Sequence, residues 1–133
     1  MGHQLKMAKL TYACVLTQQI DRLTSFYQDA LDLAPRREEA YVEFSTEPGI
    51  FCLCALDAYV EIAGSNEGPQ PGAGGIMLEF QVDNVDMEFA RLKALSRLSI
   101  EFIIPPTTMA WGNRSIYFRD PDGNLLNLFS PRA

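Results

Sequence analysis

The apolar pattern of the first half of the chain recurs in the second half. Residues 10–17 (LTYACVLT) have the composition of a β-strand, and residues 18–33 then show apolar side chains at helical spacing. A strand followed by a helix recurs at 76–98. A shift of 65 positions aligns the two halves and places Tyr12 on Met77. The pattern indicates two similar modules, although a chance recurrence of two strand–helix units would look the same.

Three further strands are expected after each helix. Their predicted segments are the charged stretch RREEA leading into YVEFS, IFCLCAL (50–56), 100–106, 113–119 and 124–129. Residues 57–64 fit either a short helix capped by Asp57 or an extension of the sheet, and we favour the helix. The sequence therefore predicts an α+β fold of two paired βαβββ modules. They could curve into a half-barrel around a cavity, because neither sheet can cover its own apolar face.

The chain has the size of one domain. It has 133 residues, of which 47% are hydrophobic, enough for one core but not for two independent ones. We expect residues 1–7, which contain the only histidine, His3, to be a leader or a frayed terminus. The predicted modules are 8–63 and 76–131, and the Gly- and Pro-rich stretch 64–75 is the predicted connector.

The charge pattern excludes some classes of partner. Seventeen acidic and eleven basic residues give a net charge of −6, and the basic residues are scattered, which argues against nucleic-acid binding. No apolar run approaches the roughly 20 residues of a membrane helix, and the N-terminus lacks the apolar region of a signal peptide. We therefore expect a cytoplasmic protein without membrane partners. Its three cysteines lie in apolar strands, and we expect no structural disulfide.

The most specific short motif is DPDG at 120–123. Pro121 presets φ for the first central position of a type I turn, Asp122 tolerates the second, and Gly123 supplies a left-handed residue. These residues predict a tight hairpin between the last two strands.

The segment 110–129 (AWGNRSIYFRDPDGNLLNLF), together with LTSFYQDALDL at 23–33, resembles the vicinal oxygen chelate superfamily. That superfamily includes glyoxalase I, bleomycin-resistance proteins, fosfomycin-resistance enzymes and extradiol dioxygenases. The resemblance spans roughly residues 8 to 131. It implies the paired βαβββ fold, a small-molecule ligand and a homodimer.

In the metal-using members of the superfamily, the ligand positions would map onto Tyr12, Met77, a position near Cys52, and Asn127. None of these is the expected type, because a divalent metal used for electrophilic chemistry requires imidazole or carboxylate ligands. We therefore expect no metal and no other cofactor, with a divalent metal held by atypical ligands as the alternative. Asn127 would replace the final acidic ligand, or it would only bond a neighbouring backbone group or a buried water.

Strand parity suggests which side chains face the cavity. Alternation places Tyr12 and Cys14 on one face, and the bulky Phe51 and Leu53 on the opposite, helix-packed face. The residues expected to bind the ligand are Tyr12, Cys14, Cys52, Cys54, Met77, Glu79, Trp111, Arg114, Tyr117 and Asn127. This apolar and aromatic lining suits an uncharged or aromatic molecule.

Several of these residues have two possible roles. Glu79 could act as a general base, or it could reach solvent or pair with an arginine. Arg114 beside Trp111 could clamp a carboxylate or stack on a ring, or the pair could pack a loop. The tyrosines could donate hydrogen bonds to a ligand or belong to the core. The three thiols could bind zinc or copper(I), or act as inert packing.

Two classes of function follow. The first is a metal-free protein, similar to bleomycin-resistance proteins, that binds a small apolar or aromatic molecule, with no catalysis required. The second is an enzyme, either a metal-dependent lyase, isomerase or dioxygenase with atypical ligands, or a metal-free enzyme that uses Glu79 as its base.

Overall fold

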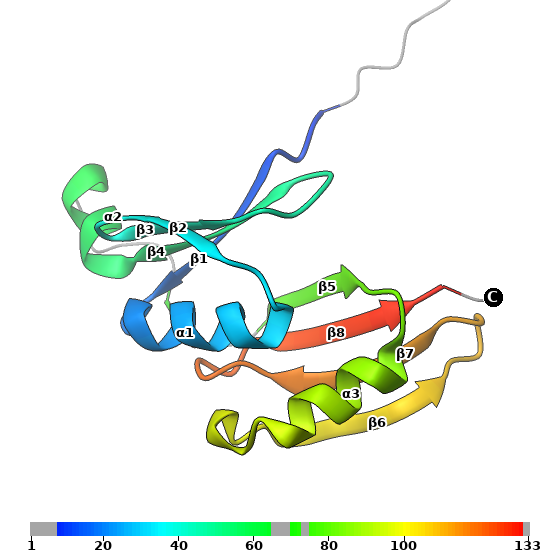
Figure 1. Ribbon diagram of the computed structural model, residues 1–133. Helices are drawn as coiled ribbons and strands as arrows, with labels where there is room; N and C mark the ends of the chain where they lie inside the picture. Colours follow the sequence, from blue (N-terminus) through cyan, green and yellow to red (C-terminus); the bar gives the residue numbers. More distant parts are fainter. Residues whose placement is uncertain (1–7, 65–69, 73–74, 132–133) are drawn as a thin grey trace, which may run out of the picture.

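A computed structural model describes residues 8–64, 70–72 and 75–131 and contains two four-stranded sheets (Figure 1). The first module comprises β1 (Tyr12–Thr17), α1 (Ile20–Leu31), β2 (Pro35–Glu38), β3 (Tyr41–Phe44), β4 (Ile50–Ala55) and α2 (Leu56–Ala63). The second comprises β5 (Met77–Gln81), α3 (Val85–Ala94), the 3₁₀ turn η1 (Ser96–Leu98), β6 (Phe102–Thr108), β7 (Arg114–Arg119) and β8 (Leu125–Ser130). The predicted leader and most of the predicted connector lie outside the described residues.

The two sheets share one strand plan. Their orders are β1-β4-β3-β2 and β5-β8-β7-β6, and in each sheet the first strand runs parallel to the last strand of its module. Tyr12 and Met77 each begin a strand, and Ile20 and Val85 each begin a helix, so the shift of 65 positions holds in the structure. The predicted pair of βαβββ modules is confirmed. The sheets remain open and do not close into a barrel.

The ambiguous segment 57–64 forms a helix, as predicted. Helix α2 begins at Leu56 with Ala55 in the capping position, so Asp57 lies in the first turn instead of at the cap. Gly64 ends the helix with φ 69°, a left-handed conformation that glycine adopts without strain. In the described part of the chain, no helix is long and apolar enough to cross a membrane.

Helix α1 lies between the two sheets (Figure 1). Its buried side chains recur at helical spacing and face both sheets. The ring of Tyr27 lies 4.7 Å from that of Phe51 in the first sheet, and the ring of Phe26 lies 6.5 Å from that of Phe118 in the second. One helix therefore joins the two modules into a single core.

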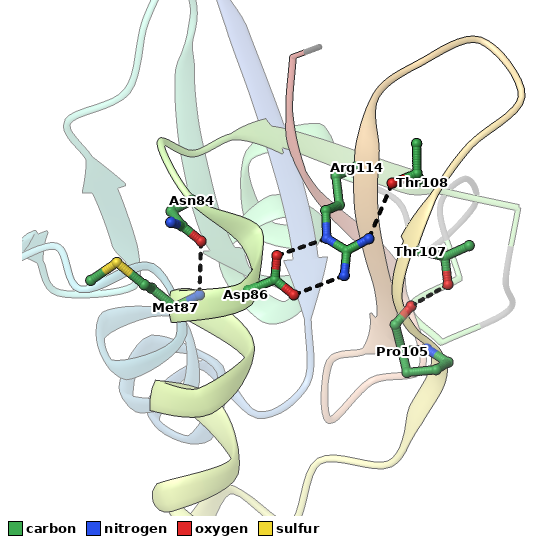
Figure 2. Close-up of polar contacts among 7 residues, drawn as sticks. All are labelled: Asn84, Asp86, Met87, Pro105, Thr107, Thr108 and Arg114. Atoms are coloured by element: carbon green, nitrogen blue, oxygen red, sulfur yellow. Dashed lines mark hydrogen bonds and ion pairs between the residues drawn. The ribbon is translucent and has the colours of Figure 1, made fainter. Parts of the chain in front are cut away.

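Helix α3 covers the second sheet (Figure 1). Asn84 caps its N-terminus by accepting a hydrogen bond of 3.0 Å from the backbone N–H of Met87 (Figure 2). On its inner face Val85 and Leu92 are buried, and Phe89 packs edge-on against Phe102 of β6 at 4.8 Å. The apolar spacing that predicted this helix is the spacing of its buried face.

The predicted turn at 120–123 forms around a buried carboxylate. Asp120, which is 5% exposed, accepts a hydrogen bond of 2.5 Å from the hydroxyl of Tyr27. Its other oxygen accepts the backbone N–H groups of Asp122 and Asn124, each at 2.9 Å. Gly123 has φ 90°, as expected for the left-handed residue of the turn. Burial raises the pKa of Tyr27 far above its ordinary value, so its hydroxyl stays a donor.

A second polar contact joins α3 to α1. The guanidinium of Arg91 donates hydrogen bonds of 2.7 Å to the backbone carbonyls of both Asp29 and Ala30. These carbonyls lie in the last turn of α1, where intrahelical donors are missing. A cation at this end also complements the helix dipole. Arg91 therefore stabilises α1 from the other module.

Replacing Tyr27 by Phe tests the buried contact. The variant leaves Asp120 with one hydrogen bond fewer in a dry site, so we expect the free energy of unfolding to fall by about 1–3 kcal/mol. Chemical denaturation monitored by circular dichroism measures this loss. The control is Tyr12→Phe, which removes a hydroxyl from a half-exposed ring and should change stability by less than about 0.5 kcal/mol. Equal effects of the two variants would contradict the role of Tyr27.

Candidate functional site

A cavity of about 240 Å³ lies between the two sheets, next to strands β1 and β5. Strands β1 and β4 contribute Tyr12 and Ile50, and β5 contributes Leu78, Glu79 and Phe80. Most of its wall is apolar. The cavity therefore combines a hydrophobic surface with a carboxylate and a phenol, both supplied by strands at sheet edges.

The turn between β3 and β4 completes the wall. Thr46 fixes this turn, because its hydroxyl donates to the carbonyl of Gly49 at 2.7 Å and accepts the backbone N–H of Phe51 at 2.9 Å. Both Thr46 and the neighbouring Glu47 line the cavity. The position of this side of the cavity thus depends on the contacts of one half-buried threonine rather than on a regular strand.

A second cavity of about 290 Å³ adjoins the first. It lies between the C-terminal end of α1, the same turn and β5, and it shares Thr46, Glu47, Glu79 and Phe80 with the first cavity. Glu79 therefore stands at the wall of both. Among the described residues, neither cavity is lined by a lysine or an arginine.

Glu79 is held in place by Asn127. The two residues are register partners on the parallel strands β5 and β8, and Nδ2 of Asn127 donates to Oε1 of Glu79 at 3.0 Å. Asn127 is 4% exposed, and its Oδ1 atom has no hydrogen-bond partner in the described part of the protein. An amide can donate to the carboxylate, whereas an ionised acid at this position would repel it. This contact gives a physical reason for an amide at position 127.

The predicted cysteines share one face of the first sheet, where Cys14 is exposed, Cys54 half-buried and Cys52 buried. Cys14 of β1 and Cys52 of β4 are register partners, and all three cysteines are free thiols. Partial burial of the Cys14 thiol, followed by the proximity of Cys52 and Cys54, raises the pKa of Cys14 to about 12. Burial also raises the pKa of Cys54. Both thiols are therefore protonated near neutral pH.

Arg114 lies on the α3 side of the second sheet (Figure 2). Its guanidinium donates two hydrogen bonds to Asp86, at 2.7 and 2.9 Å, and one of 3.1 Å to the hydroxyl of Thr108. The hydrogen bonds from Arg114 lower the pKa of Asp86. Trp111 is 67% exposed. Neither Arg114 nor Trp111 lines the cavity beside Glu79.

The structure thus divides the predicted binding residues among several places. Tyr12 and Glu79 line the cavity, Asn127 holds Glu79, and Tyr117 is the register partner of Asn127 on β7. Met77 is exposed at the start of β5, and the thiols form a separate group. Alternation along the strand missed Leu78 and Phe80, because consecutive residues of the edge strand β5 line the cavity. It also missed the turn at 46–49, because this turn belongs to no strand.

The divalent metal that the superfamily resemblance implies does not fit these residues. The positions expected to hold it offer the phenol of Tyr12, the thioether of Met77, the thiol of Cys52 and the amide of Asn127. Electrophilic catalysis by a divalent ion uses imidazole and carboxylate ligands. Within residues 8–64, 70–72 and 75–131, no three His, Cys, Asp or Glu side chains lie close enough to share an ion.

Replacing Asn127 by Asp tests the contact with Glu79. The introduced carboxyl would meet a carboxylate in a buried site, so its native pKa should rise above its unfolded value of about 3.9. A raised native pKa gives stability that is lost as pH rises. We expect the loss relative to wild type to be about 1–3 kcal/mol larger at pH 7.5 than at pH 4.5. Urea unfolding at both pH values measures it, and equal losses would contradict the contact. Asn84→Asp, which keeps an exposed helix cap, is the control.

Comparisons with known proteins agree with this fold. The family model of the Glyoxalase/Bleomycin resistance protein/Dioxygenase superfamily matches residues 9–128. No curated protein matches the chain.

Solved structures resemble the chain over nearly its whole length. A glyoxalase/bleomycin resistance protein/dioxygenase from Nocardioides is 23% identical, with a TM-score of 0.77 over 97% of this chain and 87% of that one. A glyoxalase/bleomycin resistance protein/dioxygenase family enzyme from Burkholderia phytofirmans PsJN is 21% identical, with a TM-score of 0.72 and coverages of 92% and 98%. A protein of unknown function from Agrobacterium tumefaciens str. C58 is 25% identical, with a TM-score of 0.74 and coverages of 95% and 96%. The chain belongs to the glyoxalase/bleomycin resistance protein/dioxygenase superfamily.

Proposed function

We propose that this protein binds a small apolar or aromatic molecule in the cavity between its two sheets. The observation that carries this proposal is the apolar wall formed by Ile50, Leu78 and Phe80 around a volume of about 240 Å³. A dry apolar cavity of roughly 150 Å³ already holds benzene. The larger cavity of this chain suits a compound of one or two rings, bound mainly through burial of its apolar surface.

Polar groups at the wall orient the ligand in this proposal. Glu79 offers an acceptor whose position Asn127 fixes, and the phenol of Tyr12 offers a donor. Because no basic side chain lines the cavity in the described part of the chain, an anionic ligand would meet carboxylates without a counter-charge. An uncharged ligand with a hydrogen-bond donor fits this wall best.

The proposed activity is binding without a catalytic metal. The side chains at the metal-ligand positions of the superfamily support this choice, because none of them is an imidazole or a carboxylate. A second candidate is a metal-free enzyme in which Glu79 acts as general base, since Asn127 orients its carboxylate at the wall of both cavities.

We further propose a homodimer that acts in the cytoplasm. Leu10, Ile76 and Met77 are large apolar side chains exposed close to the ends of β1 and β5. Exposed apolar side chains of this size are suited to a protein–protein contact. The superfamily resemblance supports the dimer, and the location is part of the same proposal.

Truncating Tyr12 tests the cavity as a binding site. A panel of neutral compounds with one or two aromatic rings would be screened by thermal shift, and the best compound titrated by calorimetry. We expect Tyr12→Ala to weaken binding by about tenfold or more, because it removes an aromatic contact worth roughly 1.5–3 kcal/mol. Ile103→Ala removes an exposed apolar side chain from β6 and is the matched control. Equal affinities of Tyr12→Ala and Ile103→Ala for the compound would indicate that it binds outside this cavity.

Metal analysis distinguishes binding from metal-dependent catalysis. We expect the protein, purified without chelators, to contain far less than one zinc, iron, manganese or nickel ion per chain by inductively coupled plasma mass spectrometry. One such ion per chain that is lost on Asn127→Ala or Glu79→Ala would favour the metal-dependent alternative.

A further inference from the structure

The two modules carry different types of side chain at equivalent positions. In each module, the third residue of the first strand is the register partner of the third residue of the last strand on the parallel ladder. In the second module this pair is Glu79 and Asn127, and in the first it is Cys14 and Cys52. The proposed function uses the pair in the second module. The pair of thiols has no role in it.

The geometry brings the two sulfurs close together. Neighbouring strands lie about 4.8 Å apart, and register partners point to the same face of the sheet. Cys14 is exposed on this face, whereas Cys52 is 0% exposed. The thiol pair therefore has one residue that is accessible to solutes, Cys14, and one that is enclosed by the fold, Cys52.

A tyrosine supports the buried sulfur. The hydroxyl oxygen of Tyr41 lies 3.2 Å from Sγ of Cys52 and 2.8 Å from Oε2 of Glu43. Its single proton can be donated to either acceptor. A hydroxyl turned toward the sulfur supports that sulfur as a ligand by hydrogen bonding.

We propose that Cys14 and Cys52 form a two-coordinate site for copper(I), separate from the cavity and independent of its ligand. Thiolates are soft ligands that select copper(I), a closed-shell ion that two sulfurs can hold. Zinc would require four ligands, and no group of three His, Cys, Asp or Glu side chains suited to a metal exists in the described part of the chain.

The binding step is an exchange of protons for the ion. Two S–H bonds break, two S–Cu bonds form, two protons leave to the solvent, and copper stays in the +1 state. A positive ion between the sulfurs removes the repulsion between neighbouring thiolates. The site holds its ion with one bond from each strand of the parallel ladder.

The test is an anaerobic competition between the full-length protein and a chromophoric copper(I) chelator. We expect the wild type to take up one copper(I) per chain. Cys14→Ser and Cys52→Ser each remove a direct ligand, so each should weaken binding by more than the roughly 10–100-fold typical of losing a supporting residue. Cys54→Ser is the matched control, because Cys54 lies two residues further along β4 and should leave the affinity within about threefold.

Three results would overturn the proposal. In the first, the wild type competes no better than Cys14→Ser. In the second, Cys54→Ser loses as much affinity as the other variants, which would indicate a three-sulfur site. In the third, one copper(I) binds per two chains, which would indicate a bridge between exposed Cys14 residues. Circular dichroism of each variant establishes that it is folded, and the aromatic ligand panel should bind all three cysteine variants equally.

Discussion

The hydrogen bond between Tyr27 and Asp120 is the contact on which the arrangement of the modules depends. It joins the helix of the first module to the β7–β8 turn of the second, in a site from which water is excluded. A buried carboxylate is tolerated only when its oxygens are bonded, and here the turn and the tyrosine supply the donors together. Because α1 also packs on both sheets, this contact and the aromatic core together hold the two modules against one helix.

The elements were predictable because the hydrophobic pattern and the buried faces coincide. Helix α3, expected within 76–98, buries Val85 and Leu92 at helical spacing, and Gly123 takes the left-handed conformation that its turn requires. The site was less predictable. Arg114 binds Asp86, 28 residues away on another element, and no local pattern records such a pairing. The role of Thr46 depends on how one turn meets the opposite sheet.

Asn127 shows how a missing charge can be informative. In isolation, the amide indicates only that an acidic ligand is absent. Beside Glu79, it becomes a donor that fixes the orientation of a carboxylate at the wall of a cavity. Strand parity placed both residues on one face, but the bond between them depends on the side-chain conformations of two strands that lie 48 residues apart in the chain.

In each module, the first and last strands pair in parallel and place two side chains next to each other within that module. One module has a carboxylate and an amide there, and the other has two thiols. Because the two pairs lie on separate sheets, a mutation in one has little physical reason to perturb the other. In such a duplicated scaffold, one half can keep its ligand site while substitutions give the other half a different chemistry.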